Sequence, residues 1–254
     1  MIYRRHTPRP PLSAFVELLW LFERPAPSHG SERVLPTGTT ELVIDLTNDG
    51  FDAVVAGPHS RYFVLDTSRP TSVIGAHFKP GGVFAFLGLP VGELHNSYVP
   101  LDAFWGPYVA VMRERLLVVA SPEARLQLLE RLLLAQLDPE RRSHSAVGHA
   151  LVAFRSGQRR IGDVVDETGL SPRRFIGLFS DEVGLTPKSF CRIRRFQRTV
   201  ELLHRAEIVD WVDVALACGY YDQSHMIHDF QDLAGLSPTD YLARRTAHMN
   251  HVPQ

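Results

Sequence analysis

The sequence has very few cysteines and no long apolar run. Only Cys191 and Cys218 occur among 254 residues, and both lie in stretches of helical pattern. A disulfide framework needs more cysteines, so a reduced, cytoplasmic protein is expected. No apolar run approaches the roughly 18 residues of a membrane span, and residues 1–11 are basic and proline-rich without the apolar segment of a signal peptide. A soluble protein without a membrane partner is therefore predicted.

Signatures of common enzyme classes are missing as well. No His-x-His pair occurs, and His59, His77 and His95 are scattered. Metal sites in β-barrel enzymes need clustered histidines and carboxylates. No Gly-x-Ser-x-Gly sequence is present, and residues 79–82 have the wrong spacing for a phosphate-binding loop. We predict no catalytic residue, no metal and no cofactor, and we do not expect an enzyme.

What the sequence does contain is enough apolar material for two cores. Hydrophobic residues make up 44% of the chain, and its net charge is −1. A chain of this length and composition favours two domains. The near-neutral total charge does not indicate any particular class of partner.

The last hundred residues contain one pattern twice, about fifty residues apart. The matching residues are small or apolar and keep their order along the chain. Val164, Val165, Gly169, Phe179, Gly184, Leu185, Pro187 and Phe190 correspond to Val214, Ala215, Gly219, Phe230, Gly235, Leu236, Pro238 and Tyr241. The order of these matches indicates a duplicated module.

Each copy is typical of a helix-turn-helix. In the first copy an apolar helical stripe ends at Gly169, and Ser171 followed by proline begins a second helix. In the second copy Gly219 and Asp222 take these places. Glycine suits the turn because the turn needs a positive φ.

A continuous helix is predicted between the copies, from Lys188 to Ala206, because this stretch has no Gly or Pro. Its length of roughly 27 Å approaches the roughly 34 Å that separates successive major-groove faces of B-DNA. One face carries Arg194, Arg195 and Arg198, which could reach phosphates.

These residues resemble the C-terminal DNA-binding domain of AraC/XylS-type transcriptional regulators over about residues 150–245. The endings Gly-Leu-Thr-Pro-Lys-Ser-Phe and Gly-Leu-Ser-Pro-Thr-Asp-Tyr are the most specific part of the match. The resemblance implies a transcription factor that binds double-stranded DNA, and RNA polymerase as a partner if it activates. It also implies the residues that read bases. These are Arg173, Ile176 and Gly177 in the first motif and Gln223, Ser224, His225 and His228 in the second.

The two motifs differ in their expected contribution to binding. Ile176 and Gly177 offer bases only apolar contact or close backbone approach, whereas Arg173 and Arg174 can bond guanine or phosphate. Residues 155–205 carry eleven Lys and Arg against six acids, a net charge of +5, and residues 206–254 carry −5. We therefore expect weaker binding from the second, acidic motif. His225 and His228 lie three residues apart, and without a third ligand we interpret them as exposed polar residues.

The N-terminal half has the hydrophobic period of strands rather than of helices. Residues 41–46, 52–56, 61–65 and 72–78 are short, rich in β-branched or aromatic residues, and separated by turn residues. Two helices follow, over 107–119 and 122–137. The fold class expected for the chain is α+β: a small β-rich, cupin-like or related domain with helices, then an all-α domain of two helix-turn-helix motifs joined by a long helix.

The second of these helices carries a leucine stripe of Leu126, Leu129, Leu133 and Leu137. The stripe either covers the β domain or offers a surface for a second subunit, so a homodimer is possible. A polar segment follows. The expected domains are 1–137, which regulates and senses an effector, a linker at 138–146, and the tandem helix-turn-helix domain at 147–248.

Three tracts resemble the N-terminal domain of an uncharacterised subgroup of these regulators. They are residues 33–42, 56–59 and 75–82. The resemblance implies a regulatory domain that senses a small molecule. Glu41, His59, His77 and Lys79 are the polar groups that a pocket could use. The alternatives are a cupin-type metal-dependent enzyme and an interaction module that does not bind DNA.

Overall fold

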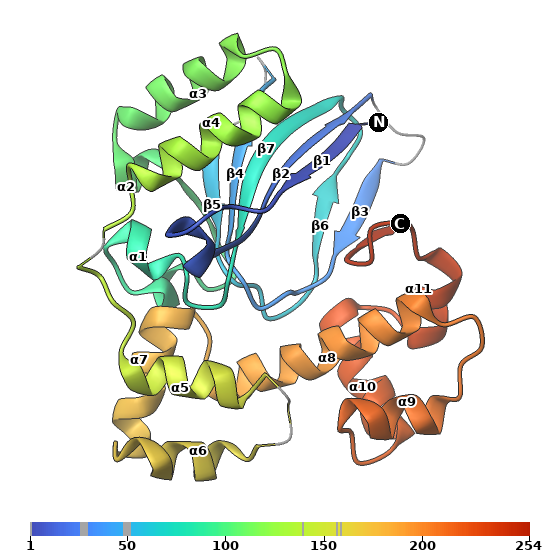
Figure 1. Ribbon diagram of the computed structural model, residues 1–254. Coiled ribbons are helices and arrows are strands. Elements are labelled where there is room, and N and C mark those ends of the chain that lie inside the picture. Colours follow the sequence, from blue (N-terminus) through green and yellow to red (C-terminus); the bar gives the residue numbers. More distant parts are fainter. Residues whose placement is uncertain (1, 26–29, 48–51, 139, 156, 158) are drawn as a thin grey trace.

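The computed structural model describes residues 2–25, 30–47, 52–138, 140–155, 157 and 159–254. A β-rich N-terminal part is covered on one side by helices, and a wholly helical part follows it along the chain (Figure 1). The architecture is the expected α+β arrangement. Its two large hydrophobic clusters correspond to these two parts, although Leu35 and Tyr62 of the N-terminal half pack in the second cluster.

Two antiparallel sheets form the N-terminal part. The first has six strands in the order β1-β2-β7-β4-β5-β8, and the second has three in the order β6-β3-β9. The strands are β1 (Ile2–His6), β2 (Val16–Arg24), β3 (Ser31–Val34), β4 (Glu41–Asp45), β5 (Ala53–Ala56), β6 (Phe63–Asp66), β7 (Thr71–Phe78), β8 (Tyr98–Pro100) and β9 (His251–Pro253).

The four predicted strands correspond to β4, β5, β6 and β7, with ends that differ by up to two residues. The sequence did not predict β2, which is the longest strand and pairs with both β1 and β7. Its side chains are buried or half-buried on both faces, apart from Glu17. A strand with two covered faces lacks the polar and apolar alternation that marks a strand in a sequence.

Helices cover one face of the larger sheet (Figure 1). They include α3 (Tyr108–Val118) and α4 (Pro122–Leu134), and α4 packs on β1 and β2. Leu126, Leu129 and Leu133 are buried in the core of the β domain, so the leucine stripe covers the sheet of its own chain. The helix ends three residues before the predicted Leu137, where the chain turns and Asp138 N donates to Ala85 O. Short elements complete this part: η1 (Leu12–Ala14), α1 (Phe84–Leu87), η2 (Val91–Leu94) and α2 (Asp102–Trp105).

The helical part contains the two predicted motifs. The first comprises α6 (Ile161–Thr168) and α7 (Pro172–Val183), and the second comprises α9 (Trp211–Cys218) and α10 (Gln223–Ala234). The continuous helix predicted between the motifs is α8 (Pro187–Arg205), the spacer helix. α5 (Ser145–Ala153) begins inside the segment expected to be a linker, and α11 (Pro238–Arg244) follows the second motif.

Local capping explains where the motif helices begin. The Ser171 side chain accepts a hydrogen bond from Arg174 N, and the Asp222 side chain accepts one from His225 N at 2.7 Å. Gly169 and Gly219 end the first helix of each motif in the left-handed conformation. The predicted caps and turn glycines are therefore confirmed.

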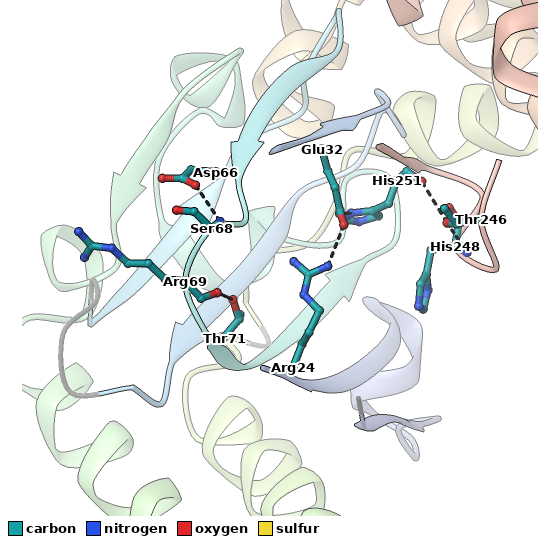
Figure 2. Close-up of polar contacts among 9 residues, drawn as sticks. All are labelled: Arg24, Glu32, Asp66, Ser68, Arg69, Thr71, Thr246, His248 and His251. Atoms are coloured by element: carbon teal, nitrogen blue, oxygen red, sulfur yellow. Dashed lines mark hydrogen bonds and ion pairs between the residues drawn. The ribbon is translucent and has the colours of Figure 1, made fainter. Parts of the chain in front are cut away.

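The chain ends in a strand that belongs to the N-terminal part. β9 pairs with β3, so the second sheet joins residues more than two hundred positions apart. Figure 2 shows that Glu32 of β3 accepts from Arg24 on one side, at 2.8 Å, and faces His251 of β9 on the other, at 3.1 Å. Leu35 N also donates to Asn250 O. These contacts attach the end of the helical part to the β domain.

Candidate nucleic-acid interface

The second helix of each motif carries the predicted base-reading residues and is called its recognition helix. The first recognition helix, α7, has one buried and one open face. Phe175 and Phe179 are fully buried in the second core. Arg173, Arg174 and Ile176 lie on the exposed face, together with Gly177. An open hollow of about 460 Å³ borders this face and is lined by Arg173, Arg174 and Gly177 among others. All four predicted residues of this helix are thus available to a partner.

Gly177 is not required by packing within the chain. A Cβ atom added at this position would meet no atom within 4 Å. Glycine in a helix costs about 1 kcal/mol relative to alanine. Gly177 therefore makes α7 less stable than alanine would, although its exposed position has room for a side chain.

The second recognition helix, α10, is arranged in the same way. Met226 is buried, while Ser224, His225 and His228 are exposed and Gln223 is half-buried. The His225 ring makes an edge contact with the ring of Tyr220 at a centroid distance of 5.3 Å. The four predicted residues of the second motif therefore lie along the N-terminal half of α10.

The acids around α10 are largely bound within the domain. Asp229 is buried, and its two oxygens accept hydrogen bonds from Arg192 at 2.7 Å and from Arg195 at 3.0 Å. Arg192 also donates to Asp232 at 2.8 Å, and both acids raise the pKa of its guanidinium against the effect of burial. Asp210 and Asp222 cap helices. The negative net charge of this segment is therefore offset in part by arginines of the spacer helix.

The three predicted phosphate ligands on α8 are half-buried. Arg195 binds Asp229, and its guanidinium lies 4.5 Å from the ring centre of Tyr220. Burial and the nearby charge of Arg198 lower the pKa of Arg194. Arg198 lies beside Gly157, before the first motif. Phosphate binding by these residues stays a prediction, and for Arg195 it would compete with an existing ion pair.

Comparison with protein families finds one match in each part of the chain. Residues 164–244 match a family described as a helix-turn-helix domain. This range spans both motifs and the spacer helix. The chain therefore carries a C-terminal helix-turn-helix domain of the AraC type. Residues 4–100 match a domain of unknown function, DUF6597.

Several solved structures of AraC-type proteins are similar to this chain over part or most of its length. A probable AraC family regulator from Rhodopseudomonas palustris is 27% identical, with 40% of this chain and 97% of that one covered and a TM-score of 0.35. ToxT from Vibrio cholerae is 11% identical over 95% of this chain and 97% of its own, with a TM-score of 0.42. The DNA-binding domain of AdpA, solved with a target DNA, is 23% identical over 39% and 87%, with a TM-score of 0.34. No curated protein matches the chain.

The structure brings together two of the four residues predicted to bind an effector. Glu41 and His77 are cross-strand neighbours on β4 and β7, and His77 Nδ1 bonds the Glu41 carboxylate. Trp20 Nε1 donates to the other Glu41 oxygen at 3.2 Å, and Thr39 lies 3.3 Å from His77 Nε2. Burial lowers the pKa of His77, but its hydrogen bond to Glu41 and the negative charges of Glu41 and Glu17 together raise it, so the net shift is upward. Trp20 was not predicted at this site from the sequence because strand β2, to which it belongs, was not predicted.

The other two residues have separate contacts. Lys79 Nζ donates to Ser13 O at 2.6 Å. The His59 ring packs against Phe63 and Tyr98, at centroid distances of 4.6 and 5.2 Å, and burial lowers its pKa. The predicted set of four therefore does not form one cluster of mutual contacts.

Within the described residues, no three His, Cys, Asp or Glu side chains are grouped to hold a metal ion. In that same part of the chain no helix is both long and apolar enough to cross a membrane.

Proposed function

We propose that this regulator binds one DNA duplex through both recognition helices, with α7 and α10 in neighbouring major grooves. The observation that carries the proposal is that α7 and α10 each bury one face and leave the N-terminal half of the other open. Side chains near the start of a recognition helix are those that contact base edges in helix-turn-helix proteins. The open residues are those predicted from the sequence.

The electrostatics support binding by the second motif as well as the first. Arg173 and Arg174 are exposed at the start of α7, so they can reach phosphate or guanine. Asp229 and Asp232 near α10 bind Arg192, which reduces their repulsion of DNA phosphates. Lower affinity of the second motif therefore does not follow from its acid count alone.

Selection from random double-stranded DNA with the purified full-length protein tests this proposal. We expect an enriched sequence with two conserved tracts about one helical turn apart, because the two recognition helices then lie on one side of the duplex. Enrichment of no sequence would overturn the proposal. Mobility-shift titration at several salt concentrations then separates phosphate contacts from base contacts.

We further propose that the N-terminal domain controls DNA binding by binding a small molecule at the Trp20, Glu41 and His77 cluster. The side chains of His77 and Glu41 are 25% and 28% exposed, so they are accessible while still held by hydrogen bonds. A carboxylate beside an indole and an imidazole can orient a small ligand with both polar and apolar parts. Thr39 links the cluster to the β3–β4 loop, where Leu35 packs in the core of the helical part. A ligand there could therefore influence the DNA-binding half.

A thermal-shift screen of a metabolite library with the wild type and Glu41→Gln tests the effector site. A compound that stabilises the wild type but not the variant, and that changes DNA affinity, is the expected result. Compounds that stabilise both proteins equally would place the site elsewhere.

We also propose that the protein forms a homodimer and acts in the cytoplasm, and that it contacts RNA polymerase if it is an activator. The proposed domains are a regulatory domain at 1–137, a linker at 138–146 and the tandem helix-turn-helix domain at 147–248.

A further inference from the structure

One loop of the β domain contacts equivalent points of the two motifs. This bridging loop comprises residues 57–62, between β5 and β6. Pro58 lies against Gly184, and Tyr62 lies against Gly235. Gly184 and Gly235 are corresponding residues of the repeat, and they end α7 and α10 in the left-handed conformation. The loop therefore joins the C-terminal ends of both recognition helices.

The first contact is close. A Cβ atom on Gly184 would lie 2.5 Å from Pro58 Cγ and 2.9 Å from Val91 Cγ1. Such distances leave no space between the helix end and the loop. Gly92 of η2 packs on the same helix, since its Cβ would lie 3.2 Å from Ser180 O. The end of α7 is thus fixed to the β domain at two neighbouring places.

The second contact combines hydrogen bonding and packing. Tyr62 N donates to Leu233 O of α10 at 2.8 Å. The Tyr62 ring occupies the position that a side chain at Gly235 would need. Arg33 lies over this ring, 4.9 Å from its centre, and donates to Gly235 O. The end of α10 is thus fixed by residues of the same loop and of β3.

The bridging loop is itself held firmly. Asn96 Oδ1 accepts a hydrogen bond from Ser60 N at 2.8 Å, and Gly57 N donates to Ser97 O at 2.9 Å. A Cβ atom on Gly57 would collide with Leu94 O. The loop is therefore hydrogen-bonded to the β domain between Pro58 and Tyr62. These bonds keep the two contact residues at a fixed distance from each other.

We propose that the bridging loop sets the separation and angle of the two recognition helices, and so determines which spacing of half-sites the protein accepts. This inference rests on the proposed binding of DNA by α7 and α10. In Figure 1, α8 runs beneath the β domain with α7 toward one end and α10 toward the other. α8 alone connects the motifs covalently. Pro58 and Tyr62 add a second, independent connection through the β domain.

A fixed separation has a measurable consequence on DNA. Adding one base pair moves two half-sites apart by about 3.4 Å and rotates them by about 34°. A protein with rigidly connected recognition helices loses DNA contacts on such a site. A protein whose second motif can move keeps them by adjusting the position of that motif. Spacing preference therefore measures how firmly the helices are connected.

The test uses the DNA site selected by the full-length wild type, and the same site with one base pair added or removed between its half-sites. We expect the wild type to lose about tenfold or more in affinity on the altered sites, the cost of about one mismatched contact. The variant Pro58→Ala/Tyr62→Ala should bind all three sites within about threefold. Tyr62→Phe keeps the ring over Gly235 and should behave like the wild type.

Two results would overturn the inference. One is a double variant that keeps the wild-type spacing preference, and the other is a wild type that binds the three sites equally. Failure of the wild type to select any sequence would instead overturn the proposed function, and with it this inference.

A second measurement needs no DNA. Spin labels on Arg173→Cys and Ser224→Cys report the distance between the starts of α7 and α10. Burial raises the pKa of the Cys191 thiol to about 11 and also raises that of Cys218, which slows labelling of both native thiols. The distance distribution should be narrow in the wild type and broader in Pro58→Ala/Tyr62→Ala. Identical distributions would contradict the proposal even if the double variant bound DNA poorly.

Discussion

Asp229 of the second recognition helix accepts a hydrogen bond from Arg195 of the spacer helix at 3.0 Å. The bond connects the acidic second motif to the basic helix that precedes it. Arg192 binds the other oxygen of Asp229, so one buried carboxylate holds two arginines. The charge difference between the two segments is therefore in part an internal pairing. The pairing of Asp229 with the two arginines holds α10 on α8.

Replacing Asp229 by Asn should destabilise the helical part by about 1–3 kcal/mol, because two arginines lose a charged partner in a mostly buried position. Asp232→Asn is the matched control. Asp232 is 44% exposed and pairs with the same Arg192, so its loss should cost less than the loss of Asp229. Urea unfolding of both variants gives the comparison. Equal losses would show that burial of Asp229 is not what matters.

Replacing Gly177 by Ala should separate stability from DNA binding. The added methyl group meets no atom of the chain, so the free energy of unfolding should rise by up to about 1 kcal/mol. If DNA approaches the α7 backbone closely, affinity for the selected site should fall. Gly148→Ala in α5 is the control, since it too has open space around the added atom. A Gly177→Ala protein that is more stable and binds DNA normally would remove Gly177 from the interface.

The paired substitution Arg173→Ala/Arg174→Ala should weaken binding and relax sequence preference at one half-site. Each good base contact is worth about 1–3 kcal/mol. Both side chains are exposed, so the fold should be unaffected. Mobility shifts on the selected site and on versions altered at each half-site measure the effect. Unchanged affinity and preference would show that α7 does not read bases.

Stability should depend on pH through His77. The pKa of His77 in the folded protein is raised by Glu41, so its pairing stabilises the fold fully below the unfolded value of about 6.5. This contribution is lost as pH rises through the folded pKa. The stability advantage of the wild type over His77→Gln should therefore be larger at about pH 6 than at about pH 8.5. An advantage that grows with pH would contradict the paired, protonated state of His77.

The sequence predicted the helical part better than the β part for a physical reason. In the two motifs, local signals such as Ser171, Asp222 and the turn glycines coincide with the helix boundaries. Strand β2 gives no such signal because both of its faces are covered. Strand β9 is three residues long and exists because β3 offers it a partner. Neither condition can be read from a short window of sequence.

The candidate sites follow the same rule. Residues on one face of one helix, such as Arg173 and Gly177, could be found by helical spacing. Glu41 and His77 meet only through the register of β4 with β7, and Trp20 joins them from a third strand. Arg192 and the bridging loop were missed because their partners lie far along the chain. Contacts of that kind require the tertiary structure.

The central claim is that both α7 and α10 read one duplex, and footprinting tests it most directly. The full-length protein should be bound to its selected site and probed by methylation of guanines in the major groove. The account predicts two protected major-groove tracts about one helical turn, roughly 10 base pairs, apart on one side of the duplex. Arg173→Ala/Arg174→Ala should abolish protection in one tract only. A single protected tract in the wild type, unaffected by changes at His225 and His228, would contradict the account.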